Sequence, residues 1–307
     1  RSAQALPEVH PVHVDRSAFA VNVDGVDFRQ SLGAMCAGCR PLQGAVAPKP
    51  AFDFRFADSV RLPDQVAAVT LVAGGVEVRL SHSFSFDPLR PSATARGRLI
   101  ASLLHGGSTL ASVTIRGEDE SFPPNTPKIR TLALPSGTSI AGPIRVEVSI
   151  ESPAGDPARI DTAAVLDVRA APRDIRVSEA RVRVQDKRVD VDAVQVDLQD
   201  VEPTIRNRVE GGAFVFELAN PFPITGTLEL RIQAGGRLIT KSLSVSPGPS
   251  TQRVSFSRDE LRAMFGNRNL MSASGPVSAA GGVVAVRPNQ ILVVKTTIDF
   301  LLRIKES

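Results

Sequence analysis

The chain has 307 residues, of which 42% are hydrophobic and 22% are charged, and it contains neither tryptophan nor tyrosine. The length suits one large or two ordinary domains, and the composition is that of a globular protein. Because 14 phenylalanines are the only aromatic residues, few rings are left to stack on bases or sugars. The 36 basic residues outnumber the 32 acidic ones only slightly and are dispersed, which argues against nucleic-acid binding.

The sequence also bears on cellular location. No apolar stretch approaches the roughly 18 residues that a membrane-spanning helix requires. The chain starts at Arg1 without methionine, which suggests that a leader has been removed. With only 2 cysteines and abundant small polar residues, this start favours an exported protein that is periplasmic, on the cell surface or extracellular. A lipid anchor upstream of Arg1 is left open.

Apolar and polar residues alternate along most of the chain, which predicts antiparallel strands with one buried and one solvated face. The clearest examples, in chain order, are 19–23, 52–56, 76–80, 144–150, 182–191 and 298–304. Turn clusters rich in glycine and proline separate them. A capping box at Ser257–Glu260, followed by Leu261, Met264 and Gly266, predicts one short helix. The fold class predicted is all-β, built from sandwiches.

An internal repeat indicates how the strands are grouped. The matching segments are Gly74–Ser81 with Gly211–Leu218, Gly106-Gly107 with Gly235-Gly236, and Gly142-Pro143 with Gly275-Pro276. Their offsets are similar, at 137 (212 − 75), 129 (236 − 107) and 133 (275 − 142) residues. We therefore predict two tandem immunoglobulin-like sandwiches, residues 1–172 and 173–307, with one short helix in the second. Chance similarity between strand sequences is the alternative.

The first repeat has an N-terminal arm and an insertion at about 29–50, which contains Cys36-Ala37-Gly38-Cys39. Arg40 stands where a haem-attachment motif needs histidine, and the all-β context disfavours a thioredoxin-like pair. A local disulfide between Cys36 and Cys39 suits an exported protein. The alternative is a zinc site, since His10 and His13 form an HxxH motif that would complete a four-ligand set with the two cysteines.

Three further groups of residues were considered for chemistry or binding. Asp190, Asp192, Asp197 and Asp200 could offer oxygen ligands to calcium, although they lack the loop spacing of known calcium motifs and suit the wet face of a strand. Phenylalanines 52, 54, 56, 84 and 86 fill a core or line a lipid cleft (Phe52, Phe54, Phe56, Phe84, Phe86). His82 has no nucleophile elbow near it, so no catalytic residue is predicted.

A segment of the second repeat resembles a known family. Phe214–Ile224 ends in Asn220-Pro221, and an alternating strand, a Gly-Gly turn and Pro247-Gly248 follow. This succession is similar to the type-two late-embryogenesis-abundant and water-stress-response domains. The resemblance covers about 40 residues and does not extend to the first repeat. It implies an immunoglobulin-like sandwich without catalytic activity, and it carries over no functional residue.

The sequence thus predicts a non-enzymatic cell-envelope or extracellular protein that acts as a structural or protein-interaction module. The partner class is other proteins or a second copy, and long alternating strands suit assembly by strand addition, as in a filament subunit. No cofactor is required, with zinc and calcium as the open possibilities. The alternative function is a hydrophobic-ligand-binding protein with a phenylalanine-lined cleft. A metal-dependent enzyme is the least favoured reading.

Overall fold

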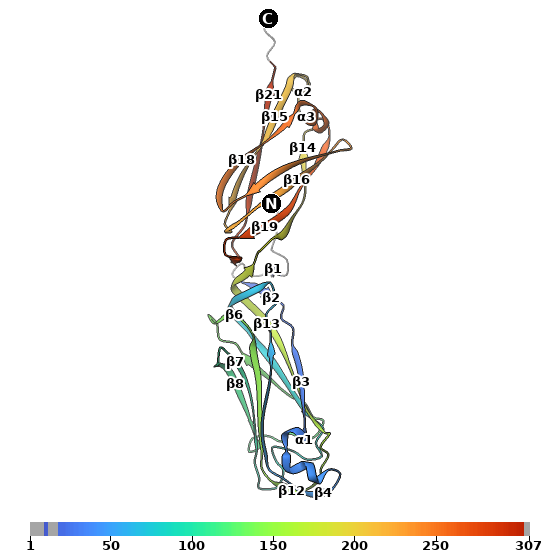
Figure 1. Cartoon of the computed structure of the whole chain (residues 1–307), viewed down its shortest axis with the longest axis vertical. Coiled ribbons are helices and arrows are strands. Elements are labelled where there is room, and N and C mark those ends of the chain that lie inside the picture. Colours follow the sequence, from blue (N-terminus) through green and yellow to red (C-terminus); the bar gives the residue numbers. More distant parts are fainter. Residues whose placement is uncertain (1–8, 12–17, 304–307) are drawn as a thin grey trace. The chain divides into compact units, whose positions relative to one another are not determined.

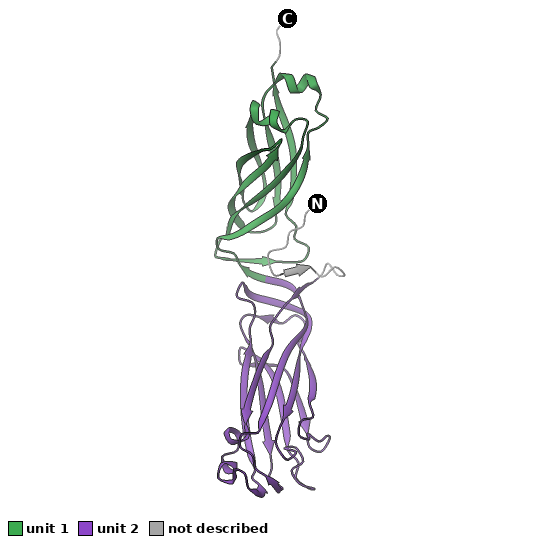
Figure 2. Ribbon diagram, turned by 90° about the vertical axis from the view of Figure 1, so that its right-hand side faces the viewer, with its two compact units in different colours: residues 1–7, 181–307 green, residues 8–180 purple. Residues whose placement is uncertain are grey.

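The computed structural model describes residues 9–11 and 18–303 of the chain (Figure 1). These residues fall into two compact units, called here the N-unit (8–180) and the C-unit (181–307) and coloured separately in Figure 2. The division lies between Ala180 and Arg181, further along the chain than the predicted boundary at 172/173. It falls inside β13, which runs from Val165 to Arg183.

The elements alternate as follows. The N-unit contains β1 (Val9–Pro11), β2 (Phe19–Val21), β3 (Val26–Ser31), α1 (Leu32–Met35), the 3-10 helix η1 (Ala37–Leu42), β4 (Val46–Lys49), β5 (Phe52–Val60), β6 (Val66–His82), β7 (Arg98–His105), β8 (Ser108–Arg116), β9 (Lys128–Ala133), β10 (Ser139–Ile140), β11 (Ile144–Ser152), β12 (Gly155–Arg159) and most of β13. The C-unit contains β14 (Lys187–Asp197), α2 (Pro203–Arg208), β15 (Val209–Asn220), β16 (Ile224–Ala234), β17 (Arg237–Val245), β18 (Gly248–Ser257), α3 (Arg258–Met264), β19 (Arg268–Ala279), β20 (Val283–Val286) and β21 (Val293–Leu302). None of the helices in the described part is long and apolar enough to cross a membrane.

The all-β prediction with antiparallel sheets is confirmed. The capping box predicts α3 correctly: the Ser257 hydroxyl accepts from the Glu260 amide at 3.3 Å, and the Glu260 carboxylate accepts from the Ser257 amide at 2.8 Å. The prediction of a single helix is wrong, because α1, η1 and α2 are also present. These helices have four to six residues, too few to show helical periodicity.

The two units repeat one strand order. In the N-unit one sheet has the order β5-β11-β7-β8, and in the C-unit one sheet has the order β14-β19-β16-β17. In the second N-unit sheet β6 lies between β13 and the short strands β9 and β10, as β15 lies between β21 and β18 in the C-unit. Matching the strands in chain order makes β5 equivalent to β14, β6 to β15, and β13 to β21.

Two of the three glycine matches found in the sequence occupy equivalent places. Gly106 and Gly107 form the β7–β8 turn, and Gly235 and Gly236 form the β16–β17 turn, all four with positive φ. Two adjacent residues in this conformation make the hairpin turn that glycine tolerates best. The third match differs, because Gly142 lies between β10 and β11 whereas Gly275 lies inside β19.

One difference between the units concerns an edge. In the N-unit, β3 pairs with β13 along Val26–Ser31 and also contacts β5 of the opposite sheet. In the C-unit, among the described residues, β21 pairs only with β15, so no strand occupies the place that β3 takes. The C-unit is therefore a shorter copy whose sheet ends at β21.

Candidate functional site

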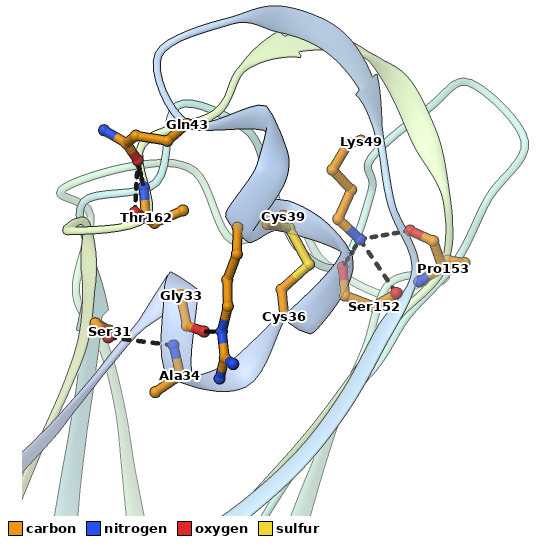
Figure 3. Close-up of a disulfide and its surroundings, with 11 residues drawn as sticks. Ser31, Gly33, Ala34, Cys36, Cys39, Gln43, Lys49, Ser152, Pro153 and Thr162 are labelled. Atoms are coloured by element: carbon orange, nitrogen blue, oxygen red, sulfur yellow. Dashed lines mark hydrogen bonds between the residues drawn. A yellow bond between two sulfur atoms is a disulfide. The ribbon is translucent and has the colours of Figure 1, made fainter.

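The segment predicted as an insertion forms a pinned loop at one end of the N-unit (Figure 3). Cys36 and Cys39 form the local disulfide, with their Sγ atoms 1.98 Å apart, between α1 and η1. Their side chains are 1% and 0% exposed. Gln43 anchors the far side, since its Oε1 accepts from both the amide and the hydroxyl of Thr162 at 2.5 Å. The disulfide is therefore part of a packed structural loop.

The zinc alternative is only partly placed by the structure. His13 lies outside the described residues, and for His10 only the backbone, in β1, is described. Zinc binds the thiolate form of cysteine, which a disulfide does not offer. Zinc binding would therefore require a reduced chain.

Replacing both cysteines by alanine is expected to lower the free energy of unfolding of the N-unit by about 2 kcal/mol, the chain-entropy estimate for so short a loop. Thermal unfolding followed by circular dichroism measures the change, and the C-unit serves as internal reference. Because both sulfurs are buried, a reductant without denaturant should leave the native disulfide intact. A double variant that melts like the parent would contradict a stabilising disulfide.

A buried lysine lies beside this loop. Lys49, at the end of β4, is 1% exposed. Its Nζ donates to the carbonyl oxygens of Ser152 at 3.1 Å and Pro153 at 2.5 Å, and to the hydroxyl of Ser152 at 2.5 Å (Figure 3). It also lies 4.5 Å from the ring centre of Phe52 and 5.4 Å from that of Phe86. The amine thus sits in a cage of oxygens and ring faces.

The hydrogen bonds of the cage indicate how the lysine is used. Ser152 donates its hydroxyl proton to the Pro88 carbonyl at 2.6 Å, so its oxygen must accept from Lys49. Three acceptors then match the three protons of an ammonium group. Burial lowers the pKa of Lys49 to about 7, and none of its described partners is a carboxylate. Because Ser152 is 2% exposed, this pair ties β4 to the end of β11 and offers no access to a substrate.

The five phenylalanines predicted as core or cleft are packed against one another and against neighbouring side chains. Phe52, Phe56, Phe84 and Phe86 are at most 8% exposed, and Phe54 is half-buried. The rings of Phe84 and Phe86 stack at 5.6 Å, and those of Phe54 and Phe56 lie 6.1 Å apart. An apolar cavity in the N-unit measures about 20 Å³ and is lined by none of the five. This arrangement matches the core-filling alternative.

His82 is a core residue of the N-unit. It is 2% exposed, and its ring stacks on Phe84 at 4.7 Å. The Nδ1 atom accepts from the Phe84 amide at 3.2 Å, so Nε2 carries the proton that is donated to the Phe122 carbonyl at 2.7 Å. Burial lowers the pKa of His82, which keeps the ring neutral. Both nitrogens serve the backbone, so neither is available as a general base.

The four aspartates considered for calcium are not brought together. Within the described residues no group of three or more His, Cys, Asp or Glu is placed to hold a metal. Asp190 lies on β14 at 3.0 Å from Arg188, and the Asp197 carboxylate accepts from the Gln199 amide at 2.9 Å. The strand is also bulged between Val191 and Val194. These carboxylates behave as the solvated face of an edge strand.

A charged groove of about 530 Å³ crosses the outer face of β3, β13 and β6. Its acidic and basic side chains pair across the strands, at 3.4 Å for Arg29 with Asp167, 3.7 Å for Arg169 with Asp27, and 3.0 Å for Arg173 with Glu77. The charges thus largely neutralise one another. The groove holds none of the residues predicted for binding.

The exposed apolar residues of the C-unit gather on its open edge. Val293, Val294, Leu301 and Leu302 of β21 are 54%, 49%, 66% and 41% exposed. We call these four residues and the unpaired side of β21 the β21 edge. The Phe300 ring lies 5.6 Å from that of Phe265, so even-numbered residues face the core and odd-numbered ones the outer surface. Backbone groups on an unpaired edge offer a ready template for another strand.

Sequence reasoning missed two of these features. Lys49 stands alone between Pro48 and Pro50, in a pattern that predicts neither its burial nor its acceptors. The strand at 298–304 was predicted, but its position at a sheet edge depends on which strands pair. The absence of a counterpart to β3 after the second repeat is the signal that could have revealed the open edge.

Comparison with known proteins gives little further information. No family model and no curated protein matches the chain. Among solved structures it is similar to a protein of Parabacteroides distasonis ATCC 8503, described as a presumed secreted protein. The two share 10% sequence identity with a TM-score of 0.28, over 96% of this chain and 90% of that one. Function is therefore inferred from the residues themselves.

Proposed function

We propose that the chain is a non-enzymatic, exported protein of the cell envelope or extracellular space. It acts as a structural or protein-interaction module by accepting an additional strand at the β21 edge. The observation that carries this proposal is the combination of an unpaired edge with four exposed apolar side chains. Strand addition uses such an edge, because main-chain hydrogen bonds supply affinity and alternate side chains supply specificity.

Each unit is, in this proposal, a variant immunoglobulin-like sandwich. Four strands in one sheet and three in the other are the numbers of a constant-type domain. The allocation differs, because the larger sheet of the C-unit takes the first, third, fourth and sixth strands of the unit (β14, β16, β17, β19). In the immunoglobulin constant domain the first, second, fourth and fifth strands share a sheet.

The proposed kinship with late-embryogenesis-abundant domains has support from one local feature. Asn220 ends β15, and its side-chain oxygen accepts from the Phe222 amide at 3.0 Å while its amide donates to the Ser246 carbonyl at 3.0 Å. Asn220-Pro221 therefore shapes a backbone turn, as the resemblance implies for this motif. The motif has a structural part and supports no enzymatic one.

Export and the lack of catalysis have separate support. Disulfides persist in oxidising compartments outside the cytosol, and Cys36–Cys39 is buried in the fold of the N-unit. His82, the histidine considered for catalysis, uses both ring nitrogens on backbone groups. Both observations favour a scaffold.

The test is to add charge to the β21 edge. Val293→Lys with Leu301→Lys is expected to abolish association of the purified chain, because lysine on an edge opposes pairing. Light scattering across a concentration series measures association. Leu270→Lys is the matched control: Leu270 is 51% exposed but lies on β19, between β14 and β16, where no strand can be added.

Circular dichroism verifies that each variant folds, which is expected because the substituted side chains are already exposed. Association that responds equally to the edge variant and to Leu270→Lys would contradict the proposal. So would a chain that stays monomeric at every concentration and binds no added strand.

A further inference from the structure

The sequence of β21 is complementary to itself when two copies run antiparallel. In the register centred on Thr297, residue i of one copy faces residue 594 − i of the other. Lys295 then faces Asp299 of the second copy, and the exposed Val293 faces Leu301. Opposite charges and apolar pairs directly across from one another are the pairings that stabilise antiparallel strands.

The same register also matches the inner face. Val294 faces Phe300 of the second copy, and Thr296 faces Ile298. Paired residues must lie on the same side of a continuous sheet, so only registers with an even sum are allowed. Moving the centre to Ile298 places Lys295 against Leu301, and moving it to Thr296 places Val293 against Asp299. Of these neighbouring registers, the one centred on Thr297 is alone in pairing the two charges.

The charged residues are accessible for this role. Lys295 and Asp299 are 75% and 50% exposed at their side chains. Within the chain they pair on one side only, Lys295 with Glu217 at 3.7 Å and Asp299 with Arg253 at 2.5 Å. Groups facing the unpaired side remain available, so a second copy would extend these pairs into a network across the sheet.

The N-unit shows what such a strand looks like when it is present. On the equivalent strand β13, β3 aligns Arg29 with Asp167 and Asp27 with Arg169, and both pairs lie within ion-pair distance. The outer face of that junction is therefore held by two cross-strand charge pairs of alternating sense. Two copies of β21 in the Thr297 register reproduce this pattern, with Lys295–Asp299 formed twice.

We propose that the strand added at the β21 edge is β21 of a second copy, antiparallel and centred on Thr297. This inference rests on the proposed function and names its partner. The contact is isologous, because the same surface serves both copies. It joins the three-stranded sheets of the two C-units into one continuous sheet.

Thr297→Cys tests the register directly. The two substituted residues would face each other at the twofold axis with Cβ atoms about 4.5–5.5 Å apart, close to the separation a disulfide needs. The native cysteines are both held in the buried disulfide, so the variant adds one free thiol per chain. Mild oxidation, or a short bifunctional thiol reagent, should convert most of the chain to a covalent dimer on non-reducing gels.

Three controls sharpen this result. Thr251→Cys introduces an exposed thiol on β18, the other edge of the same sheet, and should stay monomeric. Lys295→Cys and Asp299→Cys should each cross-link poorly alone but efficiently when mixed. Lys295→Glu should weaken the dimer roughly tenfold by placing two like-charge pairs across the contact. Lys187→Glu makes the same charge change on exposed β14 and should leave the dimer unchanged.

The outcomes separate the inference from the function on which it rests. Association that is lost in the Val293→Lys/Leu301→Lys variant without cross-linking at Thr297 would overturn self-pairing and leave strand addition standing. Loss of association after deletion of residues 1–13 would do the same, by assigning the added strand to the N-terminal arm. A chain that neither associates nor cross-links would contradict both.

Discussion

Replacing Phe84 by alanine is expected to lower the free energy of unfolding of the N-unit by about 3–5 kcal/mol, the usual cost of removing a buried phenylalanine ring. Phe84 is 1% exposed and stacks on both His82 and Phe86. Its removal leaves a cavity that the surrounding strands can close only in part. Denaturant unfolding followed by circular dichroism measures the loss.

The half-buried Phe54 provides the matched control for this experiment. Phe54→Ala removes an equal ring from β5 but should cost less, because part of that ring already faces water. The lipid-cleft alternative predicts the opposite pattern, in which Phe84→Ala leaves unfolding almost unchanged and instead lowers the affinity for a fatty-acid probe. That result would show that the phenylalanines line a site rather than fill a core.

The free energy of unfolding of the N-unit is expected to rise with pH between about 7 and 10. Burial holds the pKa of Lys49 at about 7, below its ordinary value near 10.5. In this range the unfolded chain binds a proton that the folded chain has released, so each pH unit adds up to about 1.4 kcal/mol of stability. Below pH 7 both states are protonated, and the contribution of Lys49 is constant.

Lys49→Met should remove this slope while filling most of the same volume. The absence of tyrosine simplifies the measurement, since no phenol titrates near pH 10. His82 acts in a different range: because burial lowers its pKa, its effect is a loss of stability as the pH falls below about 6.5. A parent profile that is flat from pH 7 to 10 would show that the oxygen cage and the rings fully offset burial of the charge.

The fold followed from the sequence where a local pattern was sufficient. Alternation in 52–56 and 144–150 predicts β5 and β11, and the capping box at Ser257 predicts α3, because these signals depend on neighbours in the chain. The paired glycines of the repeat likewise identify two hairpin turns. Short helices such as α2 escaped prediction because six residues complete fewer than two turns.

The candidate sites could be predicted less well, for a physical reason. A CxxC motif is local, so the Cys36–Cys39 pairing was within reach of the sequence. The cage of Lys49 is formed by residues about one hundred positions away, and no local pattern encodes that contact. The open edge of β21 depends on a strand that is missing from one repeat and present in the other, which appears only when the pairing of every strand is known.

The small sheet formed by β4 and β12 has a consequence for crowded solutions. Pro48 on β4 lies opposite Pro157 on β12, so each strand lacks one backbone donor. Proline on an edge hinders the stacking of further copies, whereas a twofold contact at Thr297 is satisfied once two copies have met. Raising the protein concentration should therefore saturate a closed pair, and turbidity from fibre growth should not follow.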